Sequence, residues 1–250
     1  MKVPRLLAIR PGAIGDCILS FPALESLRLR TDFLEIWVPT PVVPLVKFAH
    51  KVRAISNTGL DLVGLPGLDA PPKMLANYDA IVSWYGTNRD DFRTATSHLP
   101  IKFHRALPDS TNLHAVDFFC AQLQTPPLNP RIQIDAPKRD FIAIHPFSGS
   151  PKKNWPHFHD AAKQLPNVQW CATAQNPHAI SHDLGQVAHW LAEARLYIGN
   201  DSGITHLAAA VGTPVIAIFQ ASDPRIWAPR GDHVTILQSP TIEQVLKAIL

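Results

Sequence analysis

Short runs of apolar residues alternate with amphipathic segments along much of the chain. Residues 6–9 form the first apolar run, and after a glycine-bearing turn the apolar residues of 17–30 recur at helical spacing. A second apolar run follows at 35–38. This order predicts a strand, a helix and a strand, which together form a βαβ unit that opens a parallel sheet.

The same alternation continues downstream. A strand is predicted at 79–84 and a helix at 114–123. Further strands are predicted at 140–145, 168–172, 196–199, 215–219 and 234–237, with helices at 158–165, 187–194, 202–211 and 242–250. Residues 124–137 hold four prolines and few charges, which is typical of a linker. The pattern therefore predicts two Rossmann-like α/β domains, 1–137 and 138–250, that face each other across a ligand cleft.

Composition narrows the class of protein. The 250 residues are 46% hydrophobic and 17% charged, which allows a substantial core, and the net charge of +3 is too small to predict a nucleic-acid partner. Three scattered cysteines form no CxxC pair, and no apolar run approaches the ~20 residues needed to cross a bilayer. The start of the chain does not resemble a signal peptide. We expect a cytoplasmic protein, compatible with peripheral contact with a membrane.

Three segments could bind a ligand. Residues 10–16, RPGAIGD, form a turn that exposes backbone N–H groups, but the spacing is not that of a dinucleotide-binding fingerprint. Asp16 stands at the predicted helix entrance, where it could act chemically or serve only as the helix N-cap. In 145–156, hydroxyls of Ser148 and Ser150 and the charge of Lys153 suit a diphosphate, although the segment could equally be a solvated basic loop.

The third segment is 199–206, GNDSGITH. The free N–H groups of Ser202, Gly203 and Ile204 would form an anion site at the start of a helix. Asp201, or the asparagine before it, could instead be only a cap, and a lone helical histidine such as His206 is usually structural. The sequence contains no Asp-x-Asp, no metal-ligand spacing and no G-x-S-x-G.

Together these segments resemble glycosyltransferase family 9, the ADP-heptose:lipopolysaccharide heptosyltransferases. The match rests on 10–28, on 145–156, and on 199–219 with 222–229. The resemblance implies a GT-B fold, shortened relative to the family, with the acceptor bound by the N-terminal half and the donor by the C-terminal half. The chain departs from the family most clearly between 170 and 188, a region that helps to bind the nucleotide.

The resemblance also implies an activity: inverting, metal-independent transfer of heptose from ADP-heptose to a hydroxyl of a lipopolysaccharide core or related glycan. No cofactor is expected beyond the nucleotide-sugar substrate. The expected partner is a glycolipid or glycan acceptor at the inner membrane face, and the expected state is a monomer. A non-catalytic nucleotide-binding relative is the main alternative, and a Rossmann oxidoreductase fits less well.

By the same resemblance, Asp16 stands at the general base. The donor would be bound by Ser148, Ser150, Lys153, Asp201, Ser202, Gly203, Ile204 and His206. Gly12, Arg89 and Arg93 are candidates for acceptor binding. The first half also holds a basic run that would suit anionic core sugars, made up of Arg89, Arg93, Lys102, His104 and Arg105. The alternative is that this run is a solvated surface.

Overall fold

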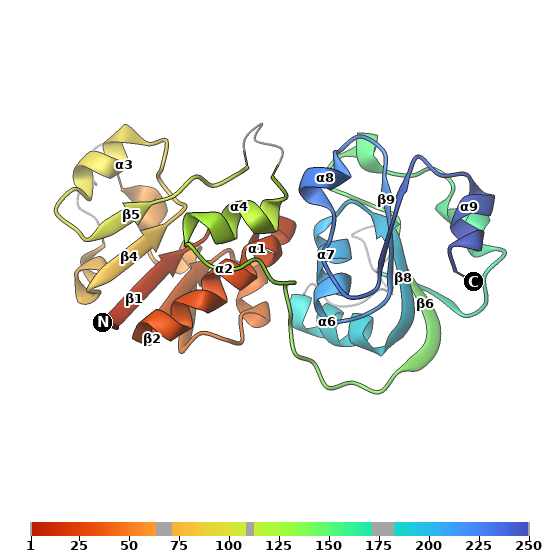
Figure 1. Ribbon diagram of the computed structural model, residues 1–250, viewed down its shortest axis with the longest axis horizontal. Coiled ribbons are helices and arrows are strands. Elements are labelled where there is room, and N and C mark those ends of the chain that lie inside the picture. The colour runs from red at the N-terminus through yellow and green to blue at the C-terminus, as the bar shows by residue number, and fades with distance from the viewer. Residues whose placement is uncertain (1, 64–71, 109–112, 172–182, 250) are drawn as a thin grey trace.

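The computed structural model describes residues 2–63, 72–108, 113–171 and 183–249. In these residues the strands form two five-stranded sheets, one in each half of the molecule (Figure 1). The first sheet has the order β3-β2-β1-β4-β5 and the second β10-β9-β8-β6-β7, and every pairing is parallel. Helices cover the sheets, so the predicted α/β class is confirmed.

The central strands of the first sheet are apolar on both faces, as expected for a strand buried between two layers. The strands are β1 (Val3–Ile9), β2 (Thr31–Val38), β3 (Lys51–Ala54), β4 (Ala80–Ser83) and β5 (Ile101–Phe103). The helices of this half are α1 (Ile14–Leu19), α2 (Phe21–Ser26), η1 (Leu27–Arg30), η2 (Thr40–Leu45), η3 (Ile55–Asn57), η4 (Leu60–Leu62), η5 (Lys73–Asn77), α3 (Asp90–Ala95) and α4 (Ala115–Gln122).

The single helix predicted for 17–30 is wrong. The helical segment begins three residues earlier and divides into α1, α2 and the 3-10 turn η1. Ser20 marks the break, where its N–H and its hydroxyl both donate to the Cys17 carbonyl, at 3.0 and 2.7 Å. Pro22 has no N–H for the carbonyl four residues earlier, so the first helix cannot continue through it.

The predictions also missed β3 and β5. Both are short edge strands with charged residues, and such strands lack the continuous apolar run by which a buried strand is recognised.

In the second half, β6 is Arg139–His145, and the predicted strands and longer helices are present with ends shifted by a few residues. The other strands are β7 (Val168–Trp170), β8 (Ala194–Asn200), β9 (Val215–Phe219) and β10 (Val234–Gln238). The helices are η6 (Pro151–Lys153), α5 (Phe158–Ala162), α6 (Leu184–Glu193), α7 (Gly203–Ala210), α8 (Pro224–Trp227) and α9 (Ile242–Lys247). The domain boundary at 137/138 stays a prediction; β6 begins directly after it.

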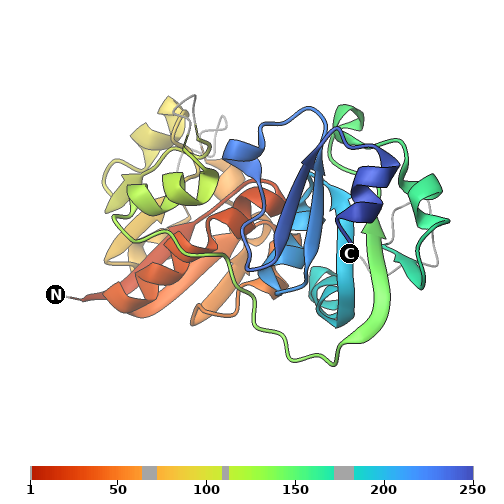
Figure 2. The same ribbon diagram turned by 45° about the vertical axis from the view of Figure 1, so that its right-hand side comes forward.

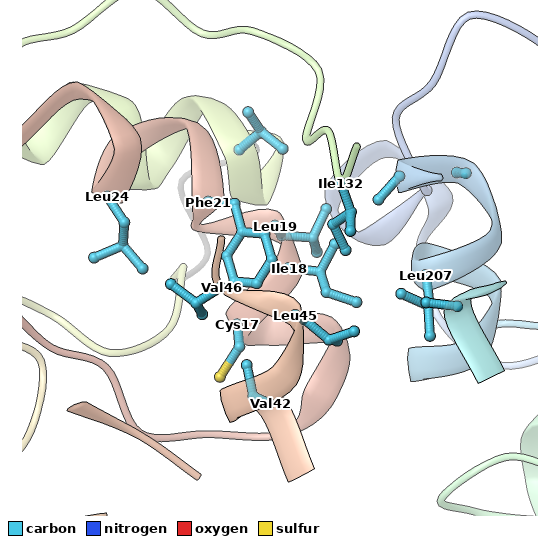
Figure 3. Close-up of a cluster of buried hydrophobic side chains, with 14 of the residues drawn as sticks. Cys17, Ile18, Leu19, Phe21, Leu24, Val42, Leu45, Val46, Ile132 and Leu207 are labelled. Carbon is cyan, nitrogen blue, oxygen red and sulfur yellow. The ribbon is translucent and has the colours of Figure 1, made fainter. Parts of the chain in front are cut away.

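One hydrophobic core extends across both halves. Ile18 and Leu45 of the first half belong to the same buried cluster as Leu207 of α7, and Ile132 from the connecting segment lies between them (Figure 3). The Ile132 N–H donates to the Ala210 carbonyl at 2.8 Å. Since burial of an apolar side chain stabilises by about 1.5–3 kcal/mol, this cluster holds the two halves in contact.

Polar contacts join the halves beside this core. Asp117 of α4 accepts two hydrogen bonds from the Arg230 guanidinium, at 2.7 and 2.5 Å, in the paired geometry that is strongest for these groups. His114, at the start of α4, donates from Nε2 to the Ala228 carbonyl at 2.9 Å. The beginning of α4 is therefore bound to the loop that follows α8.

The two halves lie side by side (Figure 2), and the first turns of α1 and α7 face each other across the junction between them (Figure 1). A Cβ on Gly15 would lie 2.7 Å from Cδ2 of His206, and a Cβ on Gly203 would lie 2.8 Å from Cβ of Ile14. Real Cβ atoms do not approach other atoms so closely. Both positions therefore require glycine to bring the two helix ends together.

We expect Gly203→Ala and Gly15→Ala each to reduce the free energy of unfolding by about 1–3 kcal/mol, because each added methyl group overpacks the junction. Alanine normally stabilises a helix relative to glycine, so a loss of stability in these variants would come from the contact between the halves. Gly149→Ala is the matched control, since a Cβ there meets nothing within 4 Å. Urea unfolding measures all three variants, and equal stability of the three would contradict this account.

Candidate active site

The turn after β1 is built around a buried arginine. Arg10 is 1% exposed, and its Nη2 donates to the Asp16 carbonyl at 3.0 Å while its Nε donates to the Ser20 hydroxyl at 3.2 Å. The guanidinium also lies 4.5 Å from the centre of the Phe119 ring. Burial lowers the pKa of Arg10, and the nearby Cys17 and Asp16 oppose this shift. Arg10 thus donates to the carbonyls of Pro11 and Asp16 and brings a positive charge next to the turn.

Asp16 is the third residue of α1, so its interpretation as the N-cap is wrong: Ala13 occupies that position. The Ala13 N–H donates to Oδ2 of Asp16 at 3.3 Å, a contact that stabilises the first turn from inside the helix. Asp16 is half-buried. Gly12 lies against it with φ +123°, a conformation that favours glycine, and a Cβ there would be 3.3 Å from Oδ2 of Asp16.

Asp201 lies between β8 and α7 but does not cap the helix either. Ser202 is the N-cap, and its hydroxyl accepts from the Thr205 N–H at 3.4 Å. The carboxylate of Asp201 therefore makes other contacts. Its Oδ2 accepts from Nζ of Lys153 at 2.6 Å and from the Ser222 hydroxyl at 2.5 Å.

The charge of Asp201 is stabilised inside the protein. Asp201 is 5% exposed, and burial alone would raise the pKa of its carboxyl group. The hydrogen bonds from Lys153 and Ser222, together with the nearby His206 ring, outweigh burial and lower this pKa to about 2. Asp201 is therefore ionised at neutral pH and can keep the Lys153 ammonium group in place.

The loop between β6 and α5 is organised by Asn200, a fully buried residue. The Asn200 Oδ1 accepts from the Trp155 N–H at 2.8 Å, and its Nδ2 donates to the Pro146 carbonyl at 2.8 Å. Within the loop the Ser148 hydroxyl lies 2.7 Å from the Asn154 Oδ1. These contacts explain how two segments far apart in the sequence place Lys153 beside Asp201.

The predicted phosphate contacts of Ser148 and Ser150 stay predictions. The Ser148 hydroxyl has two acceptors within the loop, the Ser150 carbonyl and the Asn154 Oδ1, each at 2.7 Å. A hydroxyl has one proton to donate, so a phosphate would have to replace one of these acceptors. Ser150 is half-buried at the start of η6.

His206 lies between the first turn of α1 and Asp201. Its ring is 5% exposed and lies against Gly15, while its Nε2 is 3.8 Å from Oδ1 of Asp201. A continuous set of contacts thus runs from the first turn of α1, which carries Asp16, to the Asp201–Lys153 pair. Ser202, Gly203 and Ile204 form the start of α7 at the same place. The candidate base and the candidate donor residues are brought together.

Arg89 and Arg93 lie away from this junction. Arg89 donates to the Tyr85 hydroxyl at 3.0 Å and to Asp91 at 2.7 Å. The Arg93 guanidinium lies 4.9 Å from the centre of the Phe103 ring. Both cations already have partners within the first half, and their role in acceptor binding stays a prediction.

Sequence reasoning missed three residues that shape this site. Arg10 and Asn200 lie inside the motifs but carry no catalytic signature of their own, and Ser222 lies in a loop after β9. Only their contacts with Asp16, Trp155 and Asp201 identify them. In the described parts of the chain, no group of three or more His, Cys, Asp or Glu could hold a metal ion, and no helix is both long and apolar enough to span a bilayer.

Sequence comparison connects the second half with one family. Residues 181–247 match the family model described as glycosyltransferase family 9 (heptosyltransferase). Lipooligosaccharide heptosyltransferase 2 of Haemophilus influenzae is 34% identical over 56 residues, which are 22% of this chain and 16% of that protein. Lipopolysaccharide heptosyltransferase 3 of Escherichia coli is 46% identical over 41 residues, 16% of this chain and 12% of the relative. The aligned segments thus span less than a fifth of either relative.

The fold comparison covers the whole chain. The structure of E. coli ADP-heptose lps heptosyltransferase II matches with a TM-score of 0.76 at 18% identity, over 100% of this chain and 97% of that chain. At this identity the match concerns the fold, and it confirms the predicted GT-B arrangement of two Rossmann-like halves.

The contacts of Asp201 predict a pH-dependent contribution to stability. Because its folded-state pKa is about 2 against an ordinary 3.8, the charge stabilises the fold by about 2 kcal/mol at pH 7. This contribution is complete above about pH 5 and is roughly halved by pH 3, as protons bind the unfolded chain first. We expect Asp201→Asn to lose it.

Urea unfolding of the wild type and Asp201→Asn at pH 7 and pH 3 measures the difference. Ser222→Ala, which removes one donor to the same oxygen, should lose only part of it. A gap between wild type and Asp201→Asn that is equal at both pH values would show that the carboxylate is not stabilised in this way.

Proposed function

We propose that this chain, a member of glycosyltransferase family 9 by the match over residues 181–247, is a glycosyltransferase that moves a sugar from a nucleotide diphosphate to an acceptor hydroxyl. The observation that carries the proposal is the contact between the first turns of α1 and α7. It places one carboxylate, Asp16, on the side of the first half and an ammonium group with a helix N-terminus on the side of the second. Such a pairing of a base with an anion site suits displacement of a diphosphate.

In the proposed reaction the acceptor hydroxyl attacks the anomeric carbon of the donor sugar. Asp16 accepts the hydroxyl proton as the new C–O bond forms. The bond between the anomeric carbon and the diphosphate oxygen breaks, and its electron pair leaves with the nucleoside diphosphate. Attack from the face opposite the leaving group inverts the anomeric carbon.

The leaving group gains negative charge, which the second half is equipped to stabilise. Lys153 has three N–H donors and uses one toward Asp201, so the others can reach a phosphate. The free N–H groups at the start of α7, at Gly203 and Ile204, add the positive end of a helix. We assign the donor role to these residues with Ser148, Ser150, Asp201, Ser202 and His206, and charge stabilisation of this kind needs no metal.

We propose ADP-heptose as the donor and a lipopolysaccharide core or related glycan as the acceptor. The names of the relatives support both: two are heptosyltransferases of lipooligosaccharide or lipopolysaccharide, and the matching structure is an ADP-heptose lps heptosyltransferase. We also propose that the enzyme meets such an acceptor at the cytoplasmic face of the inner membrane and that it acts as a monomer. Gly12, Arg89 and Arg93 remain the candidates on the acceptor side.

We expect Asp16→Asn to lower kcat for sugar transfer by at least about 100-fold, because asparagine cannot accept the proton. Binding of ADP should remain nearly unchanged, since Asp16 carries none of the proposed donor contacts. Transfer is measured with ADP-heptose and a core acceptor, and binding by calorimetry. Asp61→Asn, an exposed change in the same half, is the control and should retain both.

Normal turnover by Asp16→Asn would show that the assigned base is wrong. If the unsubstituted protein bound ADP but transferred nothing to any core acceptor, the chain would be a non-catalytic nucleotide-binding relative.

A further inference from the structure

A cavity opens in the first half, away from the junction. It has a volume of about 660 Å³ and lies between η1, β1, β4, β5 and the C-terminal end of α4. Its lining includes Gln122 and Leu123, whereas the contact of α4 with the second half is made at the other end, by His114 and Asp117. This cavity is therefore separate from the candidate active site.

Three cations line the cavity: Lys2, Arg30 and Lys102. The neighbouring anion Asp32 lies 4.0 Å from Lys2, and both side chains are mostly exposed, so solvent weakens their attraction. The Leu123 carbonyl, which would repel an anion at the end of α4, already accepts from Nη2 of Arg30 at 2.6 Å. The cavity thus has an excess of positive charge.

A buried polar atom is also left without a partner there. His104 lines the cavity and is 7% exposed, and its Nε2 has no hydrogen-bond partner in the described part of the chain. Stacking on Trp84, with ring centres 5.3 Å apart, fixes the orientation of the imidazole. Burial, and next to it the charge of Lys102, lower the pKa of His104, so the ring is neutral at pH 7. This nitrogen is closed to solvent, so a ligand in the cavity would touch the His104 ring rather than Nε2.

The remaining walls are apolar. Leu6, Leu27 and Val82 form a buried floor, and Leu29 lines the same cavity with 80% of its surface exposed. Leu29 is the most exposed large hydrophobic residue in the described parts of the chain. Burial of this side chain by a ligand would be favourable.

We propose that this cavity binds an anionic amphiphile, a phosphate ester that carries an alkyl chain. The phosphate would lie among Lys102, Lys2 and Arg30, beside the His104 ring. The chain would cover the apolar floor and Leu29. A phosphate fits better than a neutral polar group because it supplies charge for the cations and several acceptor oxygens. The inference does not depend on the proposed transferase activity, since none of the assigned active-site residues lines the cavity.

The test is a calorimetric titration with hexyl phosphate, compared with inorganic phosphate. We expect saturable binding of hexyl phosphate, at least about tenfold tighter than inorganic phosphate, because the chain buries apolar surface. The imidazole signals of His104, followed by ¹H–¹⁵N NMR, should shift during the titration. Absence of saturable binding, or equal affinity for the two compounds, would overturn the proposal.

Two variants locate the site. Lys2→Gln combined with Lys102→Gln should weaken hexyl phosphate binding about tenfold, and Leu29→Ser should weaken it several-fold without changing the affinity for inorganic phosphate. Lys163→Gln removes an exposed lysine directly after α5 in the second half and should leave binding unchanged. Circular dichroism confirms that each variant is folded. Equal binding by the double variant and the control would place the ligand elsewhere and overturn the proposal.

The source of the ligand is decided by a vesicle assay. Co-sedimentation with phosphatidylcholine vesicles containing phosphatidic acid, lost in the double variant, would identify a membrane lipid as the ligand. Binding of hexyl phosphate without co-sedimentation would identify a soluble alkyl phosphate. Either result supports the proposed chemistry.

Discussion

The contact between the first turns of α1 and α7 is the constraint on which the rest of the site depends. Gly15 and Gly203 let the two helices approach until the His206 ring fills the space between them. α1 follows β1 and α7 follows β8, and each of these strands is the middle strand of its sheet. This one contact therefore fixes the distance between the Asp16 side and the Lys153 side of the candidate active site. The shared core behind it, with Ile132 between α1 and α7, keeps the contact from opening locally.

Charge is concentrated around this contact at a cost in solvation. Arg10 and Asp201 are both almost completely buried, and each is surrounded by partners that compensate for the lost water. A buried ion pair contributes little net stability compared with apolar residues of similar size. The role of these two buried charges is better understood through binding: Arg10 shapes the turn before Asp16, and Asp201 positions the Lys153 ammonium group.

The two polar regions of the molecule differ in how their charges are satisfied. At the junction, Asp201 has Lys153 and Ser222 as partners, so a ligand must compete with or extend an existing network. In the cavity beside α4, the His104 nitrogen has no partner in the described chain and the cations outnumber the one nearby anion. A ligand there would add partners for these cations without disturbing the network at the junction.

The sequence by itself determined the alternation of buried strands and helices and the segments that carry the site, because strands buried on both faces are nearly continuous apolar runs and turns need particular residues. It also identified Asp16, Lys153 and Asp201 as candidates. Only the tertiary structure decided that Ala13 and Ser202 are the helix caps, that α1 and α2 are separate, and that Gly15 meets His206. The caps and the break between α1 and α2 depend on which of several neighbouring polar groups makes a hydrogen bond three residues away, and the sequence pattern leaves that choice open. The contact of Gly15 with His206 joins segments far apart along the chain, which no local pattern encodes.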